Sequence, residues 1–290
     1  MEPPTTAGSG DPSHKNGSSG SPSSPTGRPI ASASSDPTAT EGGSSSKRRA
    51  RRPRGNPARR LFRFDRSLGA RFVAGADEAG RGCLAGPLVA AAVLFDLERI
   101  GPREVRALSG LNDSKQQLPE KRAEVFPVIL RTAAKVVIVS RCAPGIDSRG
   151  LHKTNLAALR DALAKAARPG CICLSDGFPV ASLAYDQMAV VGGDAKSAAI
   201  AAASVIAKET RDRYMRRAHL SHPGWEFATH VGYSTPEHRE AIERLGISPL
   251  HRRSFQSAAY LQLGLGFSAD GVIPVDVLDE LEELEPRSAA

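Results

Sequence analysis

Hydrophobic residues along this chain occur either in short unbroken runs or at regular intervals, and the two patterns predict different elements. Short runs rich in Val, Ala and Ile that are bounded by Gly, Pro or Asp are typical of buried strands. Five runs of this kind predict strands at residues 71–77, 88–95, 135–141, 171–175 and 188–191.

Between these runs, apolar residues recur every three or four positions, which predicts helices that bury one face. The spacing marks helices at residues 119–131, 154–167, 195–217 and 236–245. Because strands alternate with helices, we expect an α/β domain in which helices pack on a sheet. The segment that joins the first two predicted strands is too short for a crossover helix, so these strands should pair antiparallel and make the sheet mixed.

The two ends of the chain differ in composition from the part that carries these patterns. Residues 1–46 are dominated by Ser, Gly, Pro, Thr and Ala and contain no Phe, Tyr or Trp, so they cannot bury enough apolar surface to offset the entropy of ordering. We therefore expect a disordered basic arm at residues 1–66, a folded domain with a helical C-terminal part at 67–265, and a flexible acidic tail at 266–290. Apolar residues near helical spacing in the tail leave a partner-binding helix as an alternative.

The formal net charge is +8, and its distribution favours a polyanionic partner. Residues 1–66 hold twelve Lys and Arg against five Asp and Glu, whereas residues 270–290 hold one Arg against seven acids. The domain between them is also basic, which matches the electrostatic footprint of a nucleic-acid binder. Many basic domains bind no nucleic acid, so charge alone leaves both classes open.

The four cysteines, Cys83, Cys142, Cys171 and Cys173, include no Cys-x-x-Cys pair and have no His at metal-ligand spacing. We expect reduced, buried thiols rather than a zinc site or a disulfide, and a cytoplasmic location. No apolar stretch reaches the length of a transmembrane helix, and the N-terminus lacks the apolar segment of a secretory signal. We therefore expect no membrane partner.

Two adjacent carboxylates, Asp77 and Glu78, stand at the end of the first predicted strand, directly before Gly80, Arg81 and Gly82. Like charges repel in a partly desolvated site, and a hard divalent cation such as Mg²⁺ offsets that repulsion. The glycines let the backbone approach a ligand closely. Acids that hold a metal, beside open backbone and a guanidinium, point to phosphodiester chemistry.

Two further acids, Asp176 and Asp194, follow the predicted strands at 171–175 and 188–191, where open α/β sheets place their ligands. Each acid alone is explained as well by a turn or a helix N-cap. Together with the first pair they predict four carboxylates at one edge of the sheet. Oxygen ligands without His or Cys favour Mg²⁺ or Mn²⁺ over zinc, and two such ions can activate a water and stabilise the leaving oxygen.

The chain also contains a series of short blocks in a characteristic order. They are DEAGRG at 77–82, AGPLVAAAV at 85–93, LNDSK at 111–115, SDG at 175–177, GDAK at 193–196, IAAASVIAK at 200–208, TRD at 210–212, GYST at 232–235 and HRRSF at 251–255. Taken together over residues 73–255, these blocks resemble the bacterial ribonuclease HII family. The ordered set is far more specific than any single block.

The resemblance implies a ribonuclease H-like fold, with a mixed sheet flanked by helices and a C-terminal helical extension. It implies a metal-dependent endonuclease that uses Mg²⁺ or Mn²⁺ and cuts the RNA strand of RNA–DNA hybrids. It also implies incision on the 5′ side of single ribonucleotides in duplex DNA, as in ribonucleotide excision repair, to leave a 3′-hydroxyl and a 5′-phosphate. We expect a monomer whose partners are these nucleic acids.

The same resemblance assigns roles to individual residues. The four acids named above become the catalytic metal ligands, and Gly80, Arg81 and Gly82 read the 2′-hydroxyl, the one group that distinguishes RNA from DNA at a single position. Tyr233 would pack on the next deoxyribose, although a Gly-Tyr pair in a loop is more often mere packing. Ser114 and Lys115 fit a phosphate site.

Weaker candidates for contact with the nucleic-acid backbone are basic residues that a solvated surface would explain equally well, namely Lys196, Lys208, Arg211, Arg252 and Arg253. Two other functions remain as alternatives. One is a different metal-dependent nuclease on the same fold, such as a junction resolvase, which has no reason to carry the Gly-Arg-Gly and tyrosine pair. The other is a non-catalytic nucleic-acid-binding protein, which the loss of one acid would mark.

Overall fold

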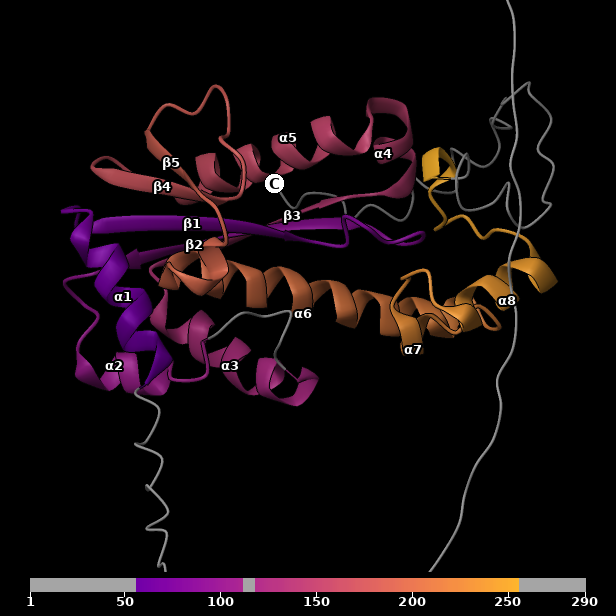
Figure 1. Cartoon of the computed structure of the whole chain (residues 1–290), viewed down its shortest axis with the longest axis horizontal. Helices are drawn as coiled ribbons and strands as arrows, with labels where there is room; N and C mark the ends of the chain where they lie inside the picture. Colours follow the sequence, from indigo (N-terminus) through magenta and orange to yellow (C-terminus); the bar gives the residue numbers. More distant parts are fainter. Residues whose placement is uncertain (1–55, 112–117, 256–290) are drawn as a thin grey trace, which may run out of the picture. The chain divides into compact units, whose positions relative to one another are not determined.

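The computed structural model describes residues 56–111 and 118–255, and Figure 1 shows them as a β-sheet with helices on both faces. The sheet has the strand order β3-β2-β1-β4-β5. Its strands are β1 (Phe72–Ala79), β2 (Leu88–Asp96), β3 (Lys135–Arg141), β4 (Cys171–Asp176) and β5 (Asp186–Val190). All five predicted strands are confirmed within two residues at each end. The mixed sheet is confirmed as well, because β1 pairs antiparallel with β2 and parallel with β4.

Helices cover the sheet in two layers, with α5 on one face and α6 on the other, backed by α1, α2 and α3 (Figure 1). The helices are α1 (Pro57–Ser67), α2 (Pro102–Ala107), α3 (Pro119–Thr132), α4 (Ala143–Arg149), α5 (Leu151–Ala166), α6 (Ala198–Ser221), α7 (Phe227–His230) and α8 (Pro236–Leu245). Two short 3₁₀ turns, η1 (Gly193–Ala195) and η2 (Arg253–Phe255), complete the described elements. The four predicted helices are present, while the patterns missed α1, α2, α4 and α7.

Small residues bring α6 very close to the central strands. A Cβ atom at Gly75 in β1 would lie 2.2 Å from the backbone nitrogen of Ile200, so only glycine fits there. The facing turns of α6 are built from buried alanines at residues 198, 199 and 201–203. The strands beneath are buried on both faces, which explains why β2 is an unbroken apolar run.

The N-terminal boundary predicted at residue 66 is wrong, because the folded unit already includes α1. Leu61 and Phe62 are buried on its inner face, and Phe62 contacts the ring of Phe95 at a centroid distance of 5.2 Å. The carboxylate of Asp65 accepts the N–H of Ala199 at 3.0 Å and so caps α6. Arginines on the outer face of α1 made this helix look like a continuation of the basic arm. The remaining expectations for the arm and the acidic tail fall outside the described residues.

All four cysteines are free thiols, as predicted, but Cys142 is exposed rather than buried. It precedes α4 at the end of the edge strand β3, where only one side of the chain is covered. None of the helices in the described part of the chain is long and apolar enough to cross a membrane.

Candidate active site

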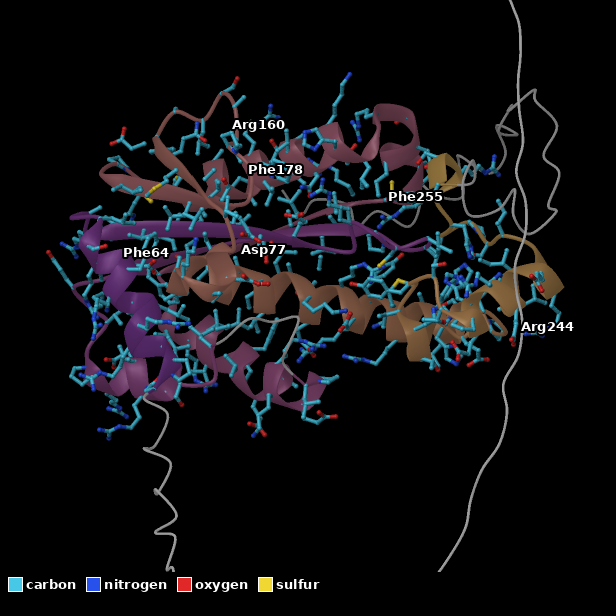
Figure 2. The ribbon with its side chains drawn as sticks, in the orientation of Figure 1. Phe64, Asp77, Arg160, Phe178, Arg244 and Phe255 are labelled. Atoms are coloured by element: carbon cyan, nitrogen blue, oxygen red, sulfur yellow. The ribbon has the colours of Figure 1, made fainter. Side chains whose placement is uncertain are left out.

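Two of the four predicted acids meet where β1 and β4 run side by side. The parallel register pairs Ala76 with Ser175, which brings Asp77 next to Asp176, the last residue of β4. The carboxyl ends of parallel strands lie at the same sheet edge, where α/β proteins bind ligands. Figure 2 shows Asp77 between the sheet and α6.

The acids adjacent in sequence face opposite sides of the sheet, because side chains alternate along a strand. Gly75 faces α6, so Asp77, two residues further along, faces α6 as well, and Glu78 faces the other side. On that other side, a carboxylate oxygen of Glu78 lies 3.8 Å from the guanidinium of Arg81. The four carboxylates therefore reach one edge of the sheet but not one face of it.

Asp194 is attached to this edge through the turn η1. The N–H of Gly193 donates to Oδ1 of Asp176 at 2.7 Å, which ties the turn to the end of β4. Asp194 is buried in that turn, just before α6 begins. The Ser197 hydroxyl accepts the N–H of Ile200 at 3.2 Å and caps α6, so the turn and the helix form one continuous support for the acid.

The Asp77 carboxylate is in an unfavourable environment without a cation. Burial raises its pKa to about 7, and the nearby charges of Glu78 and Asp176 contribute to the rise. Its Oδ1 atom accepts the N–H of Glu78 at 2.7 Å, and the nearby Ser204 hydroxyl partly offsets the rise in pKa. Oδ2 is buried and makes no hydrogen bond with the described residues. An acceptor left in this state is a natural ligand for a metal ion.

The carboxylate oxygens fit a hard divalent cation for which the protein supplies only some of the ligands. Nowhere in residues 56–111 and 118–255 do three or more His, Cys, Asp or Glu side chains gather closely enough to enclose a metal ion. Mg²⁺ commonly keeps several waters and binds through one or two carboxylates and the phosphates of a substrate. Asp77 and Asp176 match that mode, with water and a phosphate completing the coordination.

The backbone beside the acids is shaped by two glycines with different functions. Gly80 has a φ of +88°, and a Cβ atom there would lie 2.1 Å from Nε of Arg211, so no other residue fits. A Cβ atom at Gly82 would meet nothing within 4 Å, which leaves this backbone open to a ligand. Between them, the half-exposed guanidinium of Arg81 lies 5.2 Å from the ring centroid of Phe178.

Arg211 and Arg252 are not surface contacts for nucleic acid, and this candidate role is corrected. Both are fully buried. Arg211 donates to the carbonyls of Ala85, Pro87 and Val231 at 2.8–2.9 Å. The guanidinium fork thus satisfies carbonyls that the tight turns leave without partners.

Arg252 acts in the same way in the adjacent layer, where it donates to the carbonyls of Gly86 and Arg81 at 2.8–3.1 Å. Lys208 pairs with Asp212 at 2.7 Å, and Lys196 donates to the carbonyl of Val191 at 2.7 Å. These interactions give four of the five weaker candidates a structural partner. The side chain of Arg253 is exposed, while Ser114 and Lys115 lie outside the described residues.

Tyr233 lies close to the loop that carries Arg81. This residue is 40% exposed, and the ammonium of Lys208 lies 5.1 Å from the ring centroid. Burial of the hydroxyl end and the neighbouring Cys83 thiol raise the pKa of Tyr233 to about 12, so the phenol is neutral at physiological pH. The exposed part of the ring is available to a sugar or base.

A chain of buried histidines, which no sequence pattern indicated, holds the backbone of Tyr233. The N–H of Ser248 donates to Nδ1 of His251 at 2.8 Å, so the proton of His251 is on Nε2. That Nε2 contacts Nε2 of His238 at 3.1 Å, and Nδ1 of His238 contacts the carbonyl of Tyr233 at 2.8 Å. Each neutral ring therefore accepts from one neighbour and donates to the next.

Comparison with known proteins gives the fold and the site a context. The family model described as ribonuclease HII matches residues 74–258. Ribonuclease HII of Rhizobium leguminosarum bv. trifolii is 50% identical over 185 residues, which cover 63% of this chain and 77% of that protein.

Solved structures of the same kind are also similar. Ribonuclease H2 from Pyrococcus horikoshii is 28% identical with a TM-score of 0.57, covering 67% of this chain and all of that one. Bst-RNase HIII in complex with Mn²⁺ shares the fold at 21% identity and a TM-score of 0.50, covering 73% of each chain.

Protonation of the histidine chain should destabilise the fold in mild acid. Burial lowers the pKa of His238 from 6.5 to about 4, so its contribution to stability is complete above pH 6.5 and is lost as the pH falls toward 4. Over this range we expect the free energy of unfolding to fall by roughly 2–3 kcal/mol more in the wild type than in a variant without this imidazole. Urea unfolding of the wild type and of His238→Gln measures this, and an equal pH dependence in both proteins would contradict it.

Removal of the Asp77 charge should stabilise the metal-free protein at high pH. Because the folded-state pKa is raised from 3.8 to about 7, ionisation of this carboxyl group lowers the free energy of unfolding as the pH rises through this range. At pH 8 without metal, Asp77→Asn should be more stable than the wild type by roughly 1–4 kcal/mol. Added Mn²⁺ should stabilise only the wild type. Urea unfolding with and without Mn²⁺ tests both points. An Asp77→Asn variant less stable than the wild type without metal would show that the buried charge does not destabilise the protein.

Proposed function

The chain belongs to the ribonuclease HII family of endoribonucleases, and on that premise we propose that it incises duplex DNA on the 5′ side of single embedded ribonucleotides. RNA–DNA hybrids would be cut in the RNA strand by the same site. The observation that carries the proposal is the pairing of Asp77 with Asp176 at the sheet edge, where one carboxylate oxygen of Asp77 is buried and makes no hydrogen bond with the described residues. An open backbone at Gly82 lies on the loop that follows β1.

The four acids would divide the work of holding metal and substrate. Asp77 and Asp176 face α6 and would be the principal ligands of Mg²⁺ or Mn²⁺, with Asp194 supporting them from η1 and Glu78 from the other face. When bound, such a cation lowers the pKa of an attacking water and offsets charge on the phosphate oxygens. Attack of water on phosphorus would break the P–O3′ bond and leave a 3′-hydroxyl and a 5′-phosphate.

Recognition of the ribonucleotide would come from the loops beside the acids. The open backbone at Gly82 and the guanidinium of Arg81 can donate to a 2′-hydroxyl, and the exposed ring face of Tyr233 can pack on the adjoining deoxyribose. A phosphate that is misplaced by a fraction of an ångström reacts slowly. Reading of the 2′-hydroxyl would therefore contribute to catalysis as well as to binding.

A cleavage assay with Mg²⁺ or Mn²⁺ on three labelled duplexes tests this function. We expect cutting on the 5′ side of a single ribonucleotide and within the RNA strand of a hybrid, while all-DNA duplex stays intact. Asp77→Asn should bind the duplexes but cut none of them.

Equal cutting of all-DNA duplex would show that the 2′-hydroxyl is not read. Binding by the wild type without cutting of any duplex would identify a non-catalytic protein instead.

A further inference from the structure

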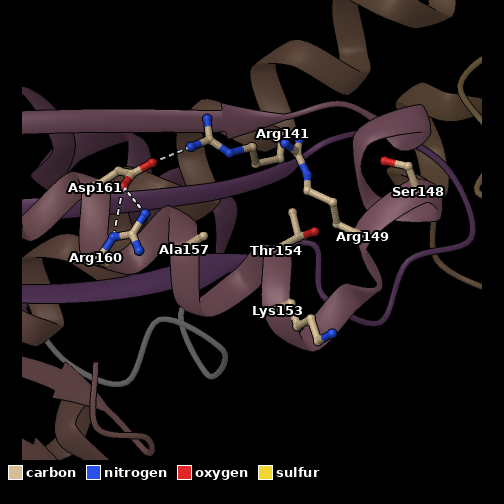
Figure 3. Close-up of a pocket in the computed structure, with 8 residues that line it drawn as sticks. All are labelled: Arg141, Ser148, Arg149, Lys153, Thr154, Ala157, Arg160 and Asp161. Atoms are coloured by element: carbon tan, nitrogen blue, oxygen red, sulfur yellow. Dashed lines mark hydrogen bonds and ion pairs between the residues drawn. The ribbon is translucent and has the colours of Figure 1, made fainter. Parts of the chain in front are cut away.

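A strongly basic hollow lies between α4, α5 and the end of β3, and none of the four acids lines it. Its volume is about 520 Å³, and Figure 3 shows the residues that line it. The cations are Arg141, Arg149, Lys153 and Arg160, and two hydroxyl groups lie among them. None of these residues has a role in the function proposed above.

Positive charge in this hollow exceeds what the protein itself neutralises. Asp161 is the one carboxylate among the lining residues, and it is shared by Arg141 at 2.5 Å and Arg160 at 3.0 Å. Within residues 56–111 and 118–255, Arg149 donates only to the carbonyl of Gly145 in its own helix, at 3.3 Å, and Lys153 forms no ion pair. Cations gathered in a hollow attract an anion, and guanidinium groups suit the paired oxygens of a phosphate.

A track of exposed side chains joins this hollow to the acids. The Arg81 guanidinium lies 5.2 Å from the ring centroid of Phe178, which follows Asp176 by two residues and is 40% exposed. The Phe178 ring meets His152 edge-on at 5.6 Å, and His152 directly precedes Lys153 on α5. Arg81 lies at one end of the track and the hollow at the other.

We propose that this hollow binds a backbone phosphate of the nucleic-acid duplex, several nucleotides from the phosphate that is cut. The proposal rests on the function proposed above, because the acids and Arg81 would hold the same duplex. Exposed cations bind a free phosphate weakly, whereas a phosphate on a strand that is already held has a high effective concentration. The contact would be independent of sequence and would set the direction in which the duplex leaves the site.

Loss of Arg149 and Lys153, the two cations without an ion pair to the described residues, tests this contact. Arg149→Ala/Lys153→Ala removes them without touching the acids, Arg81 or the Asp161 ion pairs. Its matched control, Arg59→Ala/Arg63→Ala, removes the same charge from another basic hollow between α1 and α2. Fluorescence anisotropy without divalent metal would give the Kd for an all-DNA duplex and for duplexes shortened on one or the other side of a ribonucleotide.

We expect the Arg149/Lys153 variant to bind the full duplex about tenfold more weakly than the wild type. The slope of log K against log salt concentration should be smaller by about one, because one phosphate contact is lost. On the duplex shortened on the side that reaches the hollow, the variant and the wild type should have the same Kd. The control should bind the full duplex more tightly than this variant does. Inorganic phosphate at millimolar concentration should not displace the duplex from the hollow.

Equal weakening by both double variants would assign the effect to net charge and overturn the proposal. So would the same loss of affinity on all duplex lengths. Because binding is measured without cleavage, failure of the wild type to cut any duplex would reject the proposed function alone. A wild type that cuts ribonucleotide duplexes, with an Arg149/Lys153 variant of unchanged Kd, would reject the hollow alone.

Discussion

The buried guanidinium of Arg211 is the interaction on which the loops of the candidate site depend. It extends from α6 and donates to three carbonyls in two separate turns, so the charge is offset by oxygen atoms on every side. Three glycines make the space that it fills, because a Cβ at any of them would lie 2.1–3.2 Å from the guanidinium, and they are Gly80, Gly86 and Gly232. Much of the glycine content of the recognised blocks thus follows from packing around one side chain.

A second layer of buried polar groups extends this support. Arg252 bonds the carbonyl of Arg81, and burial lowers its pKa to about 10, which leaves it charged at neutral pH. On the other loop, neutral His238 and His251 fix the carbonyl of Tyr233. The acids lie on a rigid sheet, and the groups proposed to recognise the ribonucleotide lie on loops that buried hydrogen bonds fix in place. The site is therefore preorganised, as catalysis by precise positioning of the substrate requires.

The sheet and the four acids were predictable because apolar runs and strand-end acids are local patterns. The inner face of α1 was missed because its arginines continue the basic run before it. The positions of Arg211 and Arg252 could not be predicted, since their partners are carbonyls of turns far away in sequence. The same holds for the histidine chain, whose members belong to different segments. Roles carried by the family resemblance, including those of the acids, stay proposals about this chain.

Replacement of Arg211 by lysine tests most directly whether the site needs the hydrogen bonds that this guanidinium donates to the loop carbonyls. An ammonium keeps the charge but cannot reach all three carbonyls in the geometry of a guanidinium. We expect Arg211→Lys to stay folded and to bind Mn²⁺ as the wild type does, but to cut a single-ribonucleotide duplex at least about tenfold more slowly. Arg213→Lys, at an exposed position on the same helix, should retain the wild-type rate. A wild-type rate in a folded Arg211→Lys protein would contradict the dependence of the site on this buried guanidinium.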